Sequence, residues 1–233
     1  MNFKRYESRF EAGQILARFT LKELDKYREE IELNRQTAIV FAIPNGGVPV
    51  AEGFCSILNL NYDIIIVRKI KIPYNPEAGF GAVATDGSVL LNEILLEGLH
   101  LSKEDIERSI DITKCEIEER LKIYGKSKEL KEKYLNLVRN KYIFLLDDGL
   151  ASGFTMLSAI KMLKNYLPKK IFVAVPTAPL RTVKRVKDYV DDVFCPNIRN
   201  VWHFAVADAY KHWYDVPESE VLELLKKSSY YIH

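Results

Sequence analysis

Two adjacent carboxylates, Asp147 and Asp148, directly follow an unbroken apolar run over residues 142–146. A run without polar alternation is typical of a strand that is buried on both faces, as in a parallel sheet. Open parallel sheets bind ligands at the carboxyl ends of their strands, which is where this acidic pair would lie. The pair is therefore placed where carboxylate oxygens could accept hydrogen bonds from the hydroxyl groups of a ligand.

The residues after the acidic pair, 149–155, form a small-residue loop that opens a helical pattern. The free N–H groups and the positive dipole end of a helix N-terminus form an anion site. Gly153 allows a close approach of the backbone, and Ser152 and Thr155 add hydroxyl donors. Carboxylates beside an anion site suit a sugar phosphate. The alternative is an ordinary strand-to-helix turn with an exposed acidic pair.

The whole string over residues 142–155 resembles the phosphoribosyl diphosphate (PRPP) signature of type I phosphoribosyltransferases. The resemblance implies that Asp147 and Asp148 hold the 2′- and 3′-hydroxyls of the ribose. It also implies a loop that wraps the 5′-phosphate, mostly through backbone N–H groups, and that consists of Ala151, Ser152, Gly153, Phe154 and Thr155.

A second glycine-containing turn, Pro44 to Gly47, separates a buried apolar run over 37–43 from a helical pattern over 48–58. Two glycines let the backbone direct N–H groups at a ligand, although any strand-turn-helix also favours glycine. By resemblance, Asn45, Gly46 and Gly47 are the pyrophosphate loop. Relatives commonly carry a basic residue before the two glycines, whereas Asn45 is neutral.

Three cations, Arg68, Lys69 and Lys71, lie at the end of a predicted strand over 62–68 and directly after it. Cations at the carboxyl end of a strand suit a diphosphate leaving group. The resemblance implies that Arg68 and Lys69 act in catalysis together with the acidic pair, and that they lead into a mobile loop over residues 70–80. A solvated charge cluster is the alternative.

The C-terminal region is rich in aromatic residues, and stacking on aromatic rings could hold a planar base. The resemblance implies a small hood at about 196–216, with base contacts loosely assigned to Trp202 and Phe204. Packing of the C-terminal segment or of a dimer surface is the alternative. Ala151 stands where hypoxanthine-guanine enzymes place a third acid, so the loop is more similar to that of adenine and orotate enzymes.

The elements that must position these residues alternate between strands and helices, which favours a doubly wound parallel sheet. We expect strands at 37–43, 62–68, 142–146, 170–176 and 192–195, and helices at 8–33 (one or two), 48–58, 155–166, 181–189 and 218–227. Asp86-Gly87 predicts a type I′ turn between strands 81–85 and 88–92. The predicted fold is thus a type I phosphoribosyltransferase-like five-stranded parallel sheet with flanking helices, an antiparallel hairpin and a small C-terminal hood. We expect a single domain over 1–233 with a helical insertion at about 102–140.

The composition excludes several classes of protein. The formal net charge is +2, with acids and bases interleaved, so no basic patch indicates nucleic-acid binding. No apolar run approaches the roughly 20 residues of a membrane helix, and the first residues lack the apolar core of a signal peptide, so a cytoplasmic protein is expected. Cys55, Cys115 and Cys195 show no metal-binding spacing and are expected to be small buried hydrophobic residues.

Further strings, at 46–50, 67–69, 75–77, 81–84 and 174–176, extend the resemblance to a poorly characterised group of "predicted phosphoribosyltransferases". The implied function is PRPP-dependent transfer of ribose 5-phosphate to a nitrogenous base or similar acceptor, as in nucleotide salvage, with release of pyrophosphate. Mg²⁺ held indirectly by Asp147 and Asp148 through water is implied, and so is a homodimer. The acceptor stays open. A non-catalytic PRPP sensor is the alternative, and a sugar-phosphate hydrolase is a third hypothesis, which the lack of a histidine or third acid near the loops disfavours.

Overall fold

A computed structural model describes residues 4–25, 31–126 and 130–233. Its centre is a five-stranded parallel sheet in the order β2–β1–β6–β7–β9. The strands are β1 (Ala38–Ala42), β2 (Tyr62–Ile64), β6 (Tyr142–Leu146), β7 (Lys170–Ala174) and β9 (Asp192–Phe194). Every residue of β1 and β6 is buried, as unbroken apolar runs predict for a parallel sheet. The predicted doubly wound sheet is confirmed.

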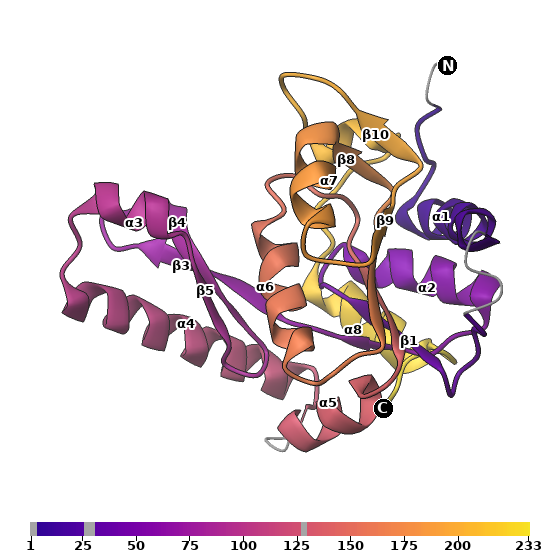
Figure 1. Ribbon diagram of the computed structural model, residues 1–233, viewed down its shortest axis with the longest axis horizontal. Helices are drawn as coiled ribbons and strands as arrows, with labels where there is room; N and C mark the ends of the chain where they lie inside the picture. The colour runs from indigo at the N-terminus through magenta and orange to yellow at the C-terminus, as the bar shows by residue number, and fades with distance from the viewer. Residues whose placement is uncertain (1–3, 26–30, 127–129) are drawn as a thin grey trace.

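Helices cover the sheet on both sides. Figure 1 shows α1 (Arg9–Leu24) and α2 (Gly47–Leu58) on one side, and α6 (Phe154–Lys164) and α7 (Leu180–Lys187) on the other. Helix α1 ends earlier than the predicted 8–33, and residues 26–30 of that prediction lie outside the described residues. Each of α2 and α6 follows a strand of the central sheet, so each helix begins near the carboxyl edge where the candidate loops lie.

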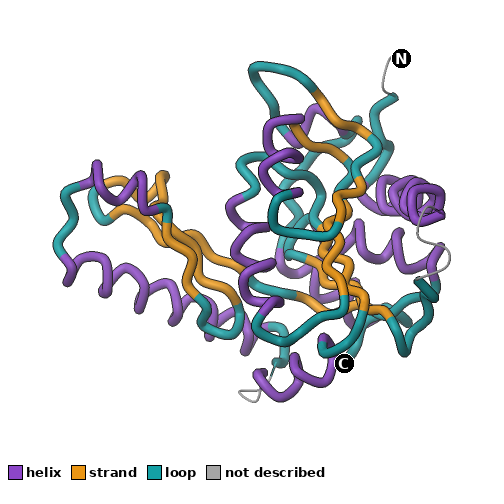
Figure 2. The backbone as a smooth tube through the Cα atoms, viewed as in Figure 1, coloured by secondary structure: helices purple, strands orange, loops and turns teal. Residues whose placement is uncertain are grey.

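A second, antiparallel sheet consists of β3 (Val67–Ile72), β4 (Asn75–Ala84) and β5 (Val89–Leu91). Together with α3 (Glu93–Leu99) and α4 (Lys103–Ile123) it forms a projection, which Figures 1 and 2 show extending away from the central sheet. We call residues 67–123 the arm. No helix among the described residues is long and apolar enough to cross a membrane.

The arm corrects two predictions. Residues 70–80, expected as a mobile loop, lie mostly in β3 and β4, where Ile70 pairs with Gly81. The alternation of buried Ile70 and Ile72 with exposed lysines is the period-2 pattern of a half-buried strand, which the neighbouring prolines obscured. The predicted strand over 62–68 is accordingly split between two sheets, at β2 and β3.

The hairpin between β4 and β5 is confirmed, but its turn is not type I′. Ala84 N–H donates to Ser88 O at 2.9 Å, and Gly87 N–H donates to Ala84 O at 2.9 Å. Only Gly87 has a positive φ, of 85°, whereas a type I′ turn needs positive φ at both central residues. The connection is therefore a three-residue loop that ends in a left-handed glycine.

The predicted insertion contains α4 and α5 (Leu130–Val138). Helix α4 begins at a capping box formed by Ser102 and Asp105, and it packs along β3 and β4. Cys115 lies exposed on α4, so the expectation that all three cysteines are buried is wrong for this one. Beyond α4, Lys126 pairs with the fully buried Asp63 of β2, which ties this segment to the central sheet.

The C-terminal region is more ordered than expected. A two-stranded parallel sheet joins β8 (Thr177–Pro179) to β10 (Asn197–Arg199), and a short 3-10 helix spans Val206–Ala209. The chain then contacts the ends of β6 and β1, through hydrogen bonds from Tyr210 to Asp148 and from Asn45 to Val216, before α8 (Glu218–Lys227). The segment at 196–216 therefore contains regular structure and supplies several of the side chains near the acidic pair.

Candidate functional site

The two glycine-containing loops meet at the carboxyl edge of β1 and β6. Ile43 N–H donates to Leu146 O at 2.9 Å, which holds the two strand ends together. A Cβ added to Gly46 would lie 2.0 Å from Asp148 Oδ2, so no side chain fits at that position without movement. The Pro44–Asn45 peptide bond is cis. The loop at Gly46 and the acidic pair, which were singled out separately in the sequence, are therefore in contact.

Asp148 is held by a residue that the sequence analysis did not single out. Arg9 Nε of α1 donates to Asp148 Oδ2 at 2.8 Å, and the two side chains are only 6% and 15% exposed. Tyr210 O–H donates to the backbone oxygen of Asp148 at 2.7 Å. A second side-chain nitrogen of Arg9 donates to the backbone oxygen of Tyr214 at 3.0 Å. Asp148 is thus fixed from both its side chain and its backbone.

Aromatic rings of the C-terminal region surround the same arginine. The guanidinium carbon of Arg9 lies 4.2 Å from the centre of the Trp213 ring. Its distances to the ring centres of Tyr210 and Tyr214 are 5.5 Å and 5.4 Å. Cation–π contacts of this kind are strongest where water is excluded. No motif near Arg9 marks it, since its partners come from the far end of the chain.

Holding Asp147 and Asp148 in their charged forms in this buried place costs free energy. Burial raises the pKa of Asp147 well above its ordinary value, and the neighbouring charge of Asp148 raises it further. Burial also raises the pKa of Asp148, while the hydrogen bond from Arg9 opposes that shift. Asp148 N–H donates to Asp147 Oδ1 at 2.8 Å, which favours the charged form of Asp147. A ligand that donates hydrogen bonds here would relieve part of this cost.

The predicted phosphate loop enters α6 through Gly153, whose φ of 74° suits a residue without Cβ. Thr182 Oγ1 of α7 donates to Ala151 O at 2.8 Å and anchors the loop. A cavity of about 540 Å³ beside the loop is lined by Ala151, Ser152, Arg181, Thr182, Arg185 and Phe204. The structure therefore brings two further arginines close to the predicted phosphate site.

The two residues loosely assigned to the base are separated by the structure. Phe204 lines the cavity beside the phosphate loop. Trp202 is 85% exposed and is not part of that lining, and its backbone oxygen accepts a hydrogen bond from Arg181 at 3.3 Å. Of the pair, only Phe204 lies where it could contact a ligand in this cavity.

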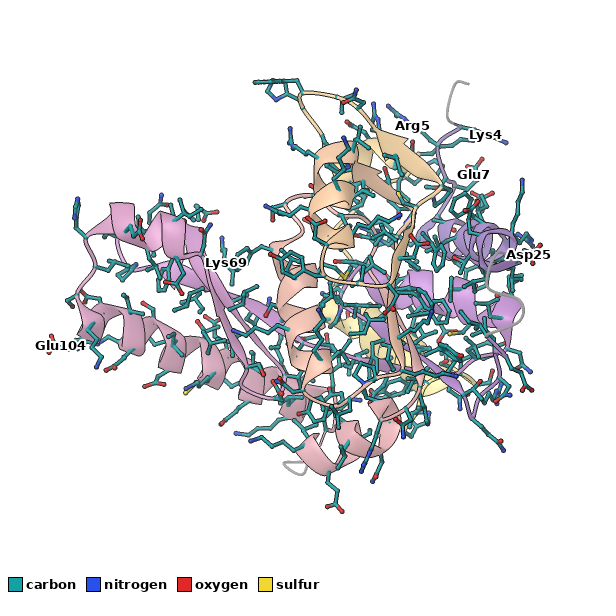
Figure 3. All side chains as sticks on the ribbon, in the orientation of Figure 1. Lys4, Arg5, Glu7, Asp25, Lys69 and Glu104 are labelled. Carbon is teal, nitrogen blue, oxygen red and sulfur yellow. The ribbon has the colours of Figure 1, made fainter. Side chains whose placement is uncertain are left out.

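Arg68, Lys69 and Lys71 lie on β3 of the arm, where Figure 3 labels Lys69. Lys69 Nζ donates to Glu77 O, and Lys71 Nζ lies 3.0 Å from Glu116 Oε1. Arg68 Nε is buried and has no hydrogen-bond partner among the described residues. The three cations line a cleft of about 390 Å³ whose other walls belong to Glu116, Glu119, Arg120, Ile123 and Glu218.

Asn45 connects the predicted pyrophosphate loop to that cleft. Its side-chain oxygen accepts a hydrogen bond from an Arg120 nitrogen at 3.2 Å, and its side-chain nitrogen donates to Val216 O at 2.8 Å. Arg120, like Arg9, was missed by the sequence analysis. Arg120 thus contacts the predicted pyrophosphate loop and also lines the cleft that contains the cations of β3.

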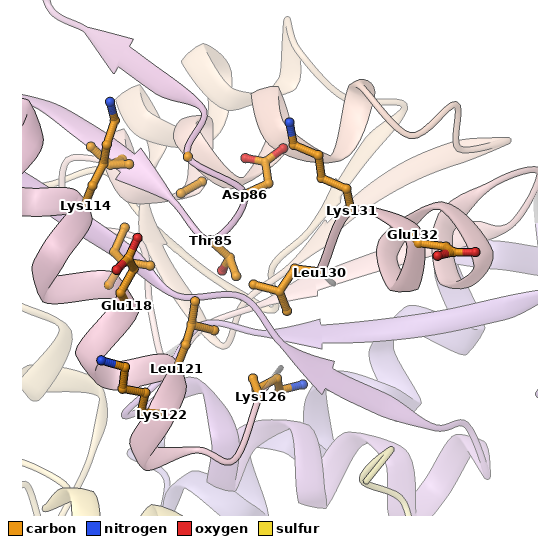
Figure 4. A pocket seen from close by; sticks show the side chains of 14 residues that line it. Thr85, Asp86, Lys114, Glu118, Leu121, Lys122, Lys126, Leu130, Lys131 and Glu132 are labelled. Atoms are coloured by element: carbon orange, nitrogen blue, oxygen red, sulfur yellow. The ribbon is translucent and has the colours of Figure 1, made fainter. Parts of the chain in front are cut away.

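A separate pocket of about 570 Å³ lies between the β4–β5 turn and the helices α4 and α5 (Figure 4). Apolar side chains and lysines line it, including Ile117, Leu121, Leu130, Lys114 and Lys131. None of the site residues predicted from the sequence belongs to this pocket. Within residues 4–25, 31–126 and 130–233, no group of three His, Cys, Asp or Glu side chains could hold a metal ion.

A parallel α/β sheet with two glycine loops and an acidic pair at its carboxyl edge defines a type I phosphoribosyltransferase fold. The family model of the phosphoribosyl transferase domain matches residues 11–211. The chain belongs to this family.

Two relatives from Mycobacterium tuberculosis, MT0597 of strain CDC 1551 / Oshkosh and Rv0571c of strain H37Rv, carry names that mark them as candidate phosphoribosyl transferases. Each is 27% identical over 225 residues, which is 97% of this chain but 47% of the relative. The chain thus spans about half the length of the curated relatives it matches. The solved structure of TT1426 from Thermus thermophilus is 26% identical with a TM-score of 0.67, and the match covers 95% of this chain and 97% of that one.

Proposed function

We propose that the protein transfers ribose 5-phosphate from PRPP to a nitrogenous base or similar acceptor and releases pyrophosphate. The observation that carries this proposal is the contact between the Gly46 loop and the acidic pair, on a chain of the phosphoribosyl transferase domain family. One ligand that bears both ribose hydroxyls and a diphosphate could engage both loops at once.

Each element of the site has a proposed role. Asp147 and Asp148 accept hydrogen bonds from the ribose hydroxyls, and residues 151–155 bind the 5′-phosphate through backbone N–H groups. Asn45, Gly46 and Gly47 contact the diphosphate together with two cations of β3, Arg68 and Lys69. We also propose that Phe204 contributes to the acceptor site, because it lines the cavity beside the phosphate loop.

The reaction breaks the bond between C1′ and the diphosphate oxygen and forms a bond from C1′ to the acceptor. No side-chain nucleophile is needed. Positive charge develops on the ribosyl ring while negative charge grows on the leaving diphosphate, so the protein acts by positioning and by electrostatic stabilisation. Mg²⁺, which prefers phosphate and water oxygens to protein ligands, would neutralise part of the diphosphate charge, with Asp147 and Asp148 able to contact its water shell.

A regulatory protein that binds PRPP without transfer is the second candidate. Two observations favour it: Asp148 is already engaged by Arg9, and Asn45 places no charge on the pyrophosphate loop. Both functions share the same binding step, so they differ only in turnover. A homodimer and a single domain over 1–233 are part of the proposal for either function.

The experiment that separates the two functions is an assay of pyrophosphate release with PRPP, Mg²⁺ and a panel of purine, pyrimidine and pyridine bases. We expect release with at least one base and none with the Asp147→Asn, Asp148→Asn double variant. Binding of PRPP by the wild-type protein without release on any base would replace the transferase with the sensor.

A further inference from the structure

We propose that Arg120, on helix α4 of the arm, supplies the cation that the pyrophosphate loop itself lacks, and that it binds the diphosphate group of the ligand. This inference rests on the proposed function and deepens it. It makes the predicted helical insertion a part of the binding site, and it assigns a role to a residue that lies outside every motif of the sequence.

The first observation is the geometry at Asn45. Because its side-chain nitrogen donates to Val216 O at 2.8 Å, its side-chain oxygen is directed at Arg120, 3.2 Å away. The neutral side chain at the loop therefore acts as an acceptor that places a guanidinium beside the loop. A lysine or arginine at position 45 has no side-chain acceptor and could not accept this hydrogen bond from Arg120.

The second observation is that Arg120 has N–H donors available for a ligand. Its nearest carboxylate oxygen, Glu218 Oε1, lies 3.7 Å away, which is an ion pair but too long for a hydrogen bond. A guanidinium carries five N–H donors, and the side chain of Arg120 is 23% exposed, so it is partly buried yet open to the cleft. Bidentate pairing with phosphate oxygens is the interaction for which this geometry is suited.

The third observation is that Arg120 shares a cleft with the cations of β3. The cleft, of about 390 Å³, is lined by Arg68 and Lys69 from one side and Arg120 from the other. Arg68 Nε is buried without a hydrogen-bond partner among the described residues, so it too has a donor free for a ligand. Of the carboxylates in this cleft, Glu116 is paired with Lys71 at 3.0 Å.

The fold accounts for the position of Arg120. Thr113, Ile117 and Leu121 are buried at four-residue spacing and form the stripe of α4 that faces the sheet of the arm. Arg120 stands next to this stripe, one residue before Leu121, so the packing of the helix fixes the direction in which its side chain leaves. Arg120 of the arm therefore places a positive charge beside the loop at Asn45, which follows strand β1 of the central sheet.

The test is calorimetry with two ligands, PRPP and ribose 5-phosphate, in the presence of Mg²⁺. Ribose 5-phosphate keeps the groups for the acidic pair and the phosphate loop but lacks the diphosphate. We expect Arg120→Gln to weaken PRPP binding by about 10-fold to 100-fold, as the loss of hydrogen bonds to a charged group does. Its affinity for ribose 5-phosphate should be unchanged.

Two further variants keep the test sharp. Lys122→Gln removes a charge two residues along the same helix and should leave both affinities unchanged, since Lys122 does not line this cleft. Adding Asn45→Lys to Arg120→Gln restores a cation at the loop and should recover most of the lost PRPP affinity.

Unchanged PRPP binding in Arg120→Gln would overturn the inference, and so would an equal loss for both ligands, because that pattern indicates a structural role. A wild-type protein that binds no PRPP would overturn the proposed function itself. If the wild-type protein binds PRPP and the Arg120→Gln variant binds it equally well, only the role of Arg120 is overturned.

Discussion

The central sheet and the arm contribute to the same candidate site but hold their charges in different ways. At the edge of the central sheet, Arg9 and Asp148 are 6% and 15% exposed and lie 2.8 Å apart. On the arm, Lys71 and Glu116 are 50% and 34% exposed and lie 3.0 Å apart. Nearly equal distances therefore describe one desolvated pair and one solvated pair.

The difference follows from the architecture. The central sheet is covered by helices on both sides, so polar groups at its edge are removed from water and must be paired. The arm is one antiparallel sheet with helices packed along it, and most of its cations reach solvent. We infer that the half of the site on the central sheet is preorganised, whereas the half on the arm can adjust to its ligand.

The largest expected effect concerns the desolvated pair. Arg9→Met leaves Asp148 buried without its partner and should lower the free energy of unfolding by about 3–5 kcal/mol. Urea denaturation at neutral pH measures it. Arg18→Met, at an exposed position of the same helix, is the control and should change the free energy of unfolding by less than about 0.5 kcal/mol. Equal effects of the two variants would contradict the contrast between buried and solvated charges.

The next effect concerns the contact between the two loops. Gly46→Ala places a Cβ 2.0 Å from Asp148 Oδ2, and Asp148 cannot yield freely because Arg9 holds it. We expect a loss of about 1–3 kcal/mol in the free energy of unfolding, as for overpacked positions. Gly98→Ala is the matched control, since nothing lies within 4 Å of an added Cβ there. That variant should be neutral or stabilising in the same denaturation experiment.

A smaller effect of opposite sign is expected at Asp147. Its raised pKa means that the folded state holds the proton more tightly than the unfolded chain, so wild-type stability falls as the pH rises from about 4 through the folded pKa. Asp147→Asn removes this cost. The variant should match the wild type near pH ~3.5 and melt a few degrees higher at pH ~8, at about 2–4 °C per kcal/mol. Scanning calorimetry that found the same offset at every pH would exclude burial of a charge as the cause.

The smallest effect is expected on the arm. Glu116→Gln should change the free energy of unfolding by less than about 1 kcal/mol, because exposed ion pairs contribute little. The remaining difference should vanish in high salt, where surface charges are screened. A loss as large as that of Arg9→Met would show that the arm is not the more adaptable half.

The sequence singled out the part of the candidate site whose residues are neighbours in the chain. The buried strand, the acidic pair and the phosphate loop occupy one stretch, residues 142–155, and the unbroken apolar run of β6 marks its start. The predicted pyrophosphate loop likewise directly follows a buried apolar strand, β1. In both cases the chemistry and the element that positions it are neighbours in the sequence, so pattern and motif point to the same place.

The residues that were missed depend on packing between distant segments. Arg9 meets Asp148 across 139 positions of the chain, and Arg120 meets Asn45 across 75. Neither arginine belongs to a motif, and exposed helix positions carry many similar charges. On the arm, residues 70–72 of β3 were predicted as part of a mobile loop because Pro73 and Pro76 nearby outweighed the alternation of Ile70 and Ile72. Tertiary contacts decided all three.

The central claim is that the acidic pair binds the ribose of PRPP. The most direct measurement is calorimetric titration of PRPP with Mg²⁺ into the wild-type protein and into the Asp147→Asn, Asp148→Asn double variant, after thermal melting has shown that both are folded. We expect binding by the wild type and a loss of at least about 100-fold in the variant, because two charge-assisted acceptors are removed at once. Equal affinity of the two proteins would contradict the ribose assignment.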